Sequence, residues 1–64
     1  MISGQEAKAA RKLIGWSQKK LAVEANISAM TVAKFEIGKP ITGRKIRAIQ
    51  ETLEMAGVDR RRRQ

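Results

Sequence analysis

Apolar side chains recur at helical spacing in four successive stretches of the chain, and the strict alternation typical of a β-strand is absent from the sequence. Turn-forming residues separate the stretches: Gly15, Asn26, Gly38 with Pro40, and Gly57. The connections are so short that consecutive helices must pack as close neighbours. The pattern therefore predicts an all-α fold, a compact arrangement of four helices.

A hydroxyl side chain stands at the expected start of each helix, where its oxygen can accept a hydrogen bond from a free backbone N–H group. These residues are Ser3, Ser17, Ser28 and Thr42. Glu6 follows Ser3 at the spacing of a capping box. We therefore expect the helices to begin directly after these hydroxyl residues.

The predicted core is made of the apolar residues that lie on one face of each helix. They are Ala7, Ala10, Leu13 and Ile14, then Leu21, Ala22 and Ala25, then Val32 and Phe35, and finally Ile46, Ile49, Leu53 and Ala56. The sequence has no cysteine and no histidine, so neither disulfides nor the commonest metal ligands can reinforce this core. A mainly aliphatic core is marginal in 64 residues, and a partner subunit is therefore expected.

Two short predicted helices, about residues 17–25 and 29–36, are joined by a tight turn at residues 26–28. Such a helix-turn-helix projects the first turn of its second helix outward. The dipole and free N–H groups of that turn favour a phosphate, and the small side chains of Ala29 and Ala33 let the backbone approach base edges. The pattern therefore predicts a recognition helix that enters the major groove of DNA.

The charge of the chain indicates the same partner. Fourteen lysines and arginines against six acidic residues give a net charge of +8, which favours a polyanion. Aromatic residues make up only 3% of the sequence, too few for stacking on the exposed bases of single strands or RNA. Double-stranded DNA is therefore the expected partner.

Several other classes of function are disfavoured by the same composition. Without histidine or cysteine, the six scattered acidic residues form no plausible catalytic set, so we expect no enzyme, no cofactor, no metal site and no small-molecule ligand. No apolar run is long enough for a membrane span, and the first residues lack a basic leader. We therefore expect a cytoplasmic, nucleoid-associated protein.

Several short motifs agree in residue type and spacing with one known family. They are Gly15-Trp16-Ser17-Gln18, Leu21-Ala22, Asn26-Ile27-Ser28, Thr31-Val32, Phe35-Glu36 and Gly38. On these residues the chain resembles the lambda-repressor-like, or Cro/C1-type (XRE), helix-turn-helix family over about residues 7–57. The resemblance implies a four-helix DNA-binding domain, here expected at residues 1–58, and leaves a basic, disordered tail at 59–64.

The resemblance also implies three sets of site residues. Base contacts are expected from Ala29, Met30, Thr31, Ala33 and Lys34. Phosphate contacts are expected from Ser17, Gln18, Ser28, Lys39, Arg44 and Lys45. Gln18 is further expected to support the first residues of the recognition helix. Arg11 and Glu36 are expected to form a partly buried ion pair that orients this helix.

Only Thr31 and Lys34 among the expected base contacts carry a hydrogen-bonding side chain. Lys34 can donate to guanine O6 or N7, whereas alanine and methionine can touch thymine methyl groups. Met30 could alternatively fill the core, although the pattern favours its exposure. Readout is therefore expected to depend on Thr31, on Lys34, on apolar contacts and on DNA deformation.

Together these features predict a transcriptional regulator of bacterial or phage type, a repressor that binds an inverted-repeat operator as a homodimer. The dimer can be stable in solution or form only on DNA. Thr52, Met55 and Val58 are either an apolar seam for the second copy or solvated surface. The arginines at 60–63 could form a phosphate-binding arm, a minor-groove arm or a tail without function, and the composition does not separate these three roles.

The alternative from another functional class is an antitoxin-like interaction module that retains the helix-turn-helix for autoregulation.

Overall fold

The computed structural model describes residues 1–57, and this part of the chain contains four helices and no strand. The helices are α1 (Gly4–Leu13), α2 (Gln18–Ala25), α3 (Ala29–Glu36) and α4 (Gly43–Met55). The predicted all-α fold is thereby confirmed. Val58 and the expected tail at 59–64 lie outside the described residues.

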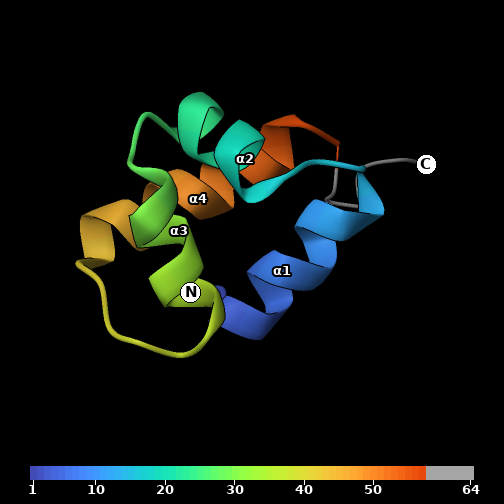
Figure 1. The fold of residues 1–64 in the computed structure, drawn as a ribbon. Coiled ribbons are helices and arrows are strands. Elements are labelled where there is room, and N and C mark those ends of the chain that lie inside the picture. The colour runs from blue at the N-terminus through green and yellow to red at the C-terminus, as the bar shows by residue number, and fades with distance from the viewer. Residues whose placement is uncertain (58–64) are drawn as a thin grey trace.

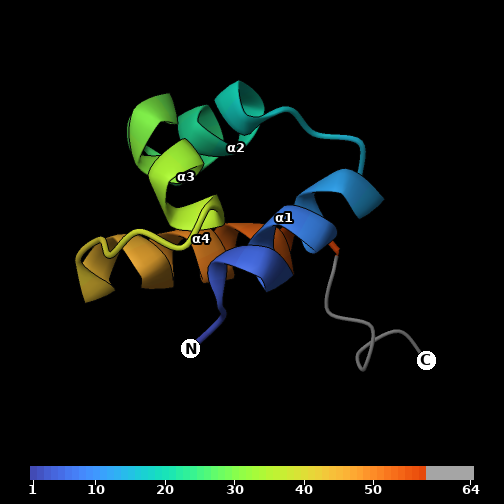
Figure 2. The ribbon, with the colours of Figure 1, turned by 60° about the horizontal axis from the view of Figure 1, so that its bottom comes forward.

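The packing of the helices leaves one side of α3 open. α2 packs on α3 and α4, and α1 also packs on α3 and α4. Figure 2 shows α2 and α3 together on one side of α4. In Figure 1 the connection from α3 to α4, coloured yellow, forms a wide loop at the edge of the molecule. α3 is therefore held by two helices on its inner side and can meet a partner with the other.

The predicted core is present with two exceptions: Leu13 is exposed, and Ala56 is only half-buried and lies outside the core cluster. The buried apolar residues are Ala7, Ala10, Leu21, Ala22, Ala25, Val32, Phe35, Ile49 and Leu53, and Ile14 and Ile46 pack against them half-buried. Leu13, in contrast, is 68% exposed. Leu13 comes six residues after Ala7 and therefore lies about 120° away from it around the helix axis. Arg11, four residues after Ala7, lies about 40° from it on the inner face of α1 and is buried.

Serine caps fix where three of the helices begin. The Ser3 hydroxyl accepts the N–H of Glu6 at 3.1 Å and the Glu6 carboxylate accepts the N–H of Ser3 at 2.9 Å, which completes the predicted capping box. Ser17 and Ser28 accept single backbone N–H groups in the same way, at 3.0 and 3.1 Å. Thr42 occupies the cap position of α4, but its side chain makes no cap hydrogen bond. The sequence thus predicts all four helix starts, although the Thr42 side chain does not act as expected.

The turn between α2 and α3 depends on a left-handed residue. Asn26 ends α2 with φ 60° and ψ 44°, and the N–H group of Ile27 closes the turn on the carbonyl of Ala22 at 3.0 Å. Asparagine is one of the few residues other than glycine that adopts this conformation at low cost. The chain therefore reverses within three residues and starts α3 at an angle to α2, the arrangement of a helix-turn-helix.

The first turn of α1 meets the last turn of α3 in direct backbone contact. A Cβ atom added at Gly4 would overlap the carbonyl oxygen of Phe35 and would lie 2.9 Å from the Phe35 carbonyl carbon and 3.2 Å from Cα of Glu36. These are backbone atoms, which cannot turn aside as a side chain can. Gly4 therefore permits a distance between α1 and α3 that no other residue allows.

Replacing Gly4 with alanine should separate these helices and lower the free energy of unfolding by about 1–3 kcal/mol, the usual cost of an overpacked contact. Gly43 offers a matched control, because it is also the first residue of its helix and a Cβ there meets only the end of the Met1 side chain, at 3.7 Å. Gly43→Ala should be neutral or slightly stabilising. Urea denaturation followed by circular dichroism measures both, and equal stability of the two variants would contradict the proposed contact.

Candidate nucleic-acid interface

The residues expected to contact bases all lie on α3, with graded exposure. Ala29, Met30 and Lys34 are exposed, and Thr31 and Ala33 are half-buried. Met30 is 67% exposed, which rules out a role as a core residue. Val32, Phe35 and Glu36 instead form the buried face of the same helix.

The hydroxyl groups at the start of α3 are bonded to each other. The oxygens of Ser28 and Thr31 lie 2.8 Å apart, and the Ser28 oxygen also accepts the backbone N–H of Thr31. Two hydroxyl groups carry two protons, and this mutual hydrogen bond uses one of them. The pair therefore retains one O–H group that can donate to an external acceptor.

Gln18, the first residue of α2, is bonded to the far end of the recognition helix. Its side-chain Nε2 donates to Glu36 Oε1 at 2.9 Å. From the resemblance we expected the Gln18 side chain to contact the first residues of α3. Within the protein it contacts Glu36, the last residue of this helix. The Ser17 hydroxyl, one residue earlier, accepts the backbone N–H of Lys20 and keeps its own proton for another partner.

A buried ion pair joins α1 to α3. Arg11 Nε donates to Glu36 Oε2 at 2.7 Å and Arg11 Nη2 donates to Glu36 Oε1 at 2.9 Å, with side chains only 9% and 2% exposed. Arg11 Nη1 also donates to the backbone carbonyl of Trp16 at 2.8 Å. Among the described residues, every buried side-chain nitrogen and oxygen has a hydrogen-bond partner. Arg11 therefore fixes the end of α3 and the connection before α2 at the same time.

The surroundings of Glu36 keep it ionised. Burial alone would raise its pKa, but hydrogen bonds from Arg11 and Gln18, together with the charges of Arg11 and Lys8, outweigh burial and hold the pKa below its usual value. The hydrogen bond to Glu36 raises the pKa of Arg11, against the opposing effect of burial. Both side chains are therefore charged at neutral pH.

Basic side chains gather where α3 leads into α4. Lys39 in the loop and Arg44 and Lys45 in the first turn of α4 are all exposed. Within α4, the first turn has no acidic residue and the last turn has no basic residue. This order opposes the helix dipole, which favours acidic residues at the start of a helix and basic residues at its end. The start of α4 therefore concentrates positive charge that an external anion can neutralise.

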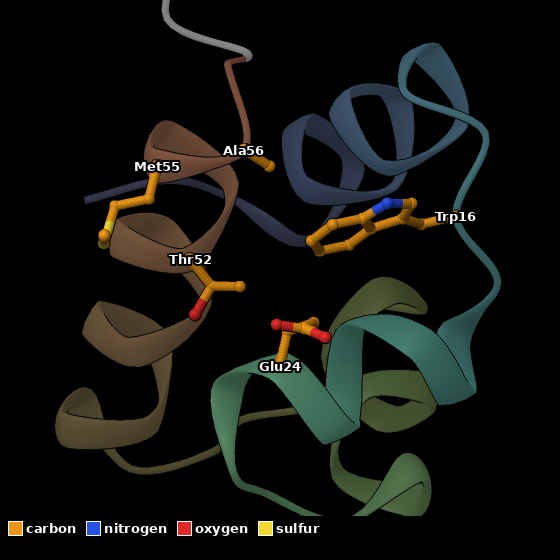
Figure 3. Close-up of a pocket in the computed structure, with 5 residues that line it drawn as sticks. All are labelled: Trp16, Glu24, Thr52, Met55 and Ala56. Carbon is orange, nitrogen blue, oxygen red and sulfur yellow. The ribbon is translucent and has the colours of Figure 1, made fainter.

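A groove lies between α2 and α4. Trp16, Glu24, Thr52, Met55 and Ala56 line it, as Figure 3 shows. Trp16 is half-buried and packs against the core. Beside it, the ammonium of Lys20 lies 5.5 Å from the centre of the Trp16 ring and 3.1 Å from Glu24 Oε2. The groove is therefore partly apolar, with its charges already paired.

The described residues offer neither a metal site nor a membrane span. Residues 1–57 contain no group of three or more acidic side chains arranged to hold a metal ion. The four helices are all too short and too polar to cross a membrane. The arrangement that remains is a helix-turn-helix with basic residues beside its second helix.

The comparison with known families decides what this arrangement is. A family model described as helix-turn-helix matches residues 8–60, which include most of α1 and all of α2, α3 and α4. The chain belongs to this family. It is a Cro/C1-type helix-turn-helix protein, as its sequence motifs indicated. No curated protein and no solved structure matches the chain significantly. Membership makes the protein a DNA-binding regulator whose partner is double-stranded DNA.

Removing one partner of the ion pair should destabilise the protein more than removing both partners. Glu36→Ala leaves a buried guanidinium without its partner and should lower the free energy of unfolding by about 3–5 kcal/mol. The double substitution Arg11→Met with Glu36→Leu removes both charges and should recover most of that loss. Thermal and urea denaturation measure the two variants. A double variant as unstable as Glu36→Ala would refute this interpretation.

The same double variant also tests the charge on Glu36. Because the pKa of Glu36 is lower in the folded than in the unfolded chain, its stabilisation is complete above the unfolded pKa of about 4.3 and is lost as the pH falls through the folded pKa. Stability measured from neutral pH downward should therefore decline less steeply in the double variant than in the original protein. The other acidic residues are common to both proteins and serve as the internal control.

Proposed function

We propose that this protein is a transcriptional repressor that binds an inverted-repeat operator through the major groove, as a homodimer on half-sites about one helical turn apart. The observation that carries the proposal is the open face of α3. On the buried side of this helix, Glu36 accepts hydrogen bonds from Arg11 of α1 and Gln18 of α2, which fix the end of the helix. A helix fixed at its C-terminal end presents its N-terminal turn in one defined orientation. A groove-reading helix needs such an orientation for sequence-specific binding.

The groups proposed to bind phosphates surround this helix. Ser17 caps α2 as an acceptor and keeps its hydroxyl proton for a phosphate oxygen. The hydrogen-bonded pair of Ser28 and Thr31 keeps one free O–H group, which Ser28 can donate to a second phosphate when Thr31 donates to Ser28. Gln18 uses one N–H of its amide for Glu36 and has a second N–H for a phosphate. Lys39, Arg44 and Lys45 supply the positive charge on the flank. Phosphate contacts of this kind set the position of the protein on the duplex, whereas base contacts set the sequence.

The proposed base contacts are Ala29, Met30, Thr31, Ala33 and Lys34. The flexible ammonium of Lys34 can reach guanine O6 or N7 in the major groove. Repression is the simplest outcome for a small domain of this type, because occupation of a promoter blocks other proteins from it. Such a regulator of bacterial or phage type acts in the cytoplasm, on the chromosome.

A second candidate is an antitoxin-like interaction module that keeps DNA binding for autoregulation. The groove between α2 and α4 favours it, because Met55 at the groove is 88% exposed and offers an apolar contact to another protein. The two candidates share the DNA-binding surface. They differ in whether the α2–α4 groove carries a second function.

Selection of bound sites from a random pool of duplexes tests the main proposal. Enrichment of a motif with two-fold symmetry is the expected result, because a homodimer presents two identical recognition helices. Repeating the selection with Lys34→Ala should relax the preference at one base position in each half-site and leave the others unchanged. Failure to enrich any motif would exclude a sequence-specific repressor and leave a domain that binds DNA without sequence preference or binds protein alone.

Binding to the selected duplex should weaken steeply with salt, by a slope of about −0.9 in log affinity against log salt for each phosphate neutralised. Arg44→Gln and Lys45→Gln should each make this slope less steep by about one, equally for all DNA sequences. Lys20→Gln is the matched control, since it removes the same charge from an ammonium already paired with Glu24. Fluorescence anisotropy over a salt series measures all three variants, and an unchanged slope for Arg44→Gln and Lys45→Gln would argue against these phosphate contacts.

A further inference from the structure

The outward face of α3 is unusually apolar for a surface that meets DNA. Ala29, Met30 and Ala33 have no hydrogen-bonding side chain, and Met30 is 67% exposed. The one acidic residue of α3, Glu36, is turned inward and is only 6% exposed. Lys34 is the only charged side chain on the exposed part of this helix.

Thr31 adds less polarity to this face than its sequence suggests. Its hydroxyl is bonded to the Ser28 hydroxyl at 2.8 Å, and the two residues together keep a single free O–H group. If that group donates to a phosphate from Ser28, Thr31 brings no hydroxyl donor to the bases. What Thr31 then offers to a base edge is its methyl group and an acceptor oxygen.

The major groove offers one apolar feature to such a face. Base pairs display hydrogen-bond donors and acceptors there, and thymine alone of the four bases adds a C5-methyl group. Methionine suits contact with a methyl group, because its unbranched, polarisable side chain adapts to irregular surfaces. Lys34 is exposed on the same helix, and the exposed Lys39 and Arg44 follow it in the chain, so this part of the surface attracts a polyanion.

We propose that α3 selects its half-site mainly through the C5-methyl groups of thymines, with Met30 as the central contact and Ala29 and Ala33 beside it. This inference rests on the proposed function and specifies its target as half-sites rich in A·T pairs with thymines at defined positions. Lys34 is then the one cationic donor to a base, and it selects a guanine next to the thymines. Met30 is the specificity-determining residue of the helix.

Deoxyuridine provides a direct test, because uracil lacks only the C5-methyl group and keeps the hydrogen-bonding atoms of thymine. The duplex enriched by selection is made again with deoxyuridine at each thymine of the half-sites. Affinity should fall about fourfold for each methyl group that the protein contacts, the effect expected from losing the burial of one such group. Deoxyuridine placed outside the half-sites should leave affinity unchanged.

A variant of Met30 assigns the contact to this residue. Met30→Ala should bind the thymine duplex more weakly than the original protein and should lose much less affinity when uracil replaces thymine, since the partner of the methyl group is already gone. Met55→Ala is the matched control: Met55 is 88% exposed in the α2–α4 groove, so its removal should leave the full uracil penalty. Both methionines are exposed, and circular dichroism should show unchanged folding.

The outcomes separate this inference from the function on which it rests. Equal affinity for thymine and uracil duplexes, with a selected motif still bound, would overturn the inference and leave the repressor in place. An undiminished uracil penalty in Met30→Ala would overturn the role of Met30. Binding to no duplex would overturn both proposals. In that case, self-association that Met30→Ala abolishes would make this face of α3 a contact between proteins.

Discussion

The structure depends on one buried ion pair. Arg11 and Glu36 lose most of their hydration, and their attraction roughly offsets that cost, so the pair adds little to net stability. What it adds is geometry, because a bidentate guanidinium and a carboxylate fit in one arrangement. With Gln18 on the same carboxylate and the carbonyl of Trp16 on the same guanidinium, α1, α2 and α3 meet at a single point. A core of mainly small aliphatic side chains could not by itself define the angle of α3 so closely.

Charge on α4 shows a different compromise. Arg44 and Lys45 in its first turn and Glu51 and Glu54 in its second half oppose the helix dipole, so the isolated helix is weakened by its own side chains. Ile49 and Leu53, both fully buried, compensate through packing. Stability and charge are thereby assigned to different faces of the same helix. The exposed start of α4 is left positively charged.

Local signals in the sequence predict this fold well, because helix starts and turns depend on short-range chemistry. The serine caps, the capping box and the left-handed Asn26 all follow from the residues themselves. Contacts between distant residues are harder to predict. The partner of Gln18 at the end of α3 and the backbone contact of Gly4 arise only when the helices pack, and a glycine at the first position of a helix gives no sign of them. Leu13 was misplaced because it lies about 120° around α1 from Ala7, off the inner face on which Arg11 is buried.

The two faces of α3 also differ in how well they tolerate substitution. Val32, Phe35 and Glu36 point inward and hold the helix, whereas Met30 and Lys34 point outward and can be replaced with little disturbance of the fold. Under the proposed readout by these two residues, a new preference for DNA is within reach of one or two surface substitutions. The separation makes this small domain a suitable scaffold for redesign, and it gives natural variants a short path to a different DNA sequence.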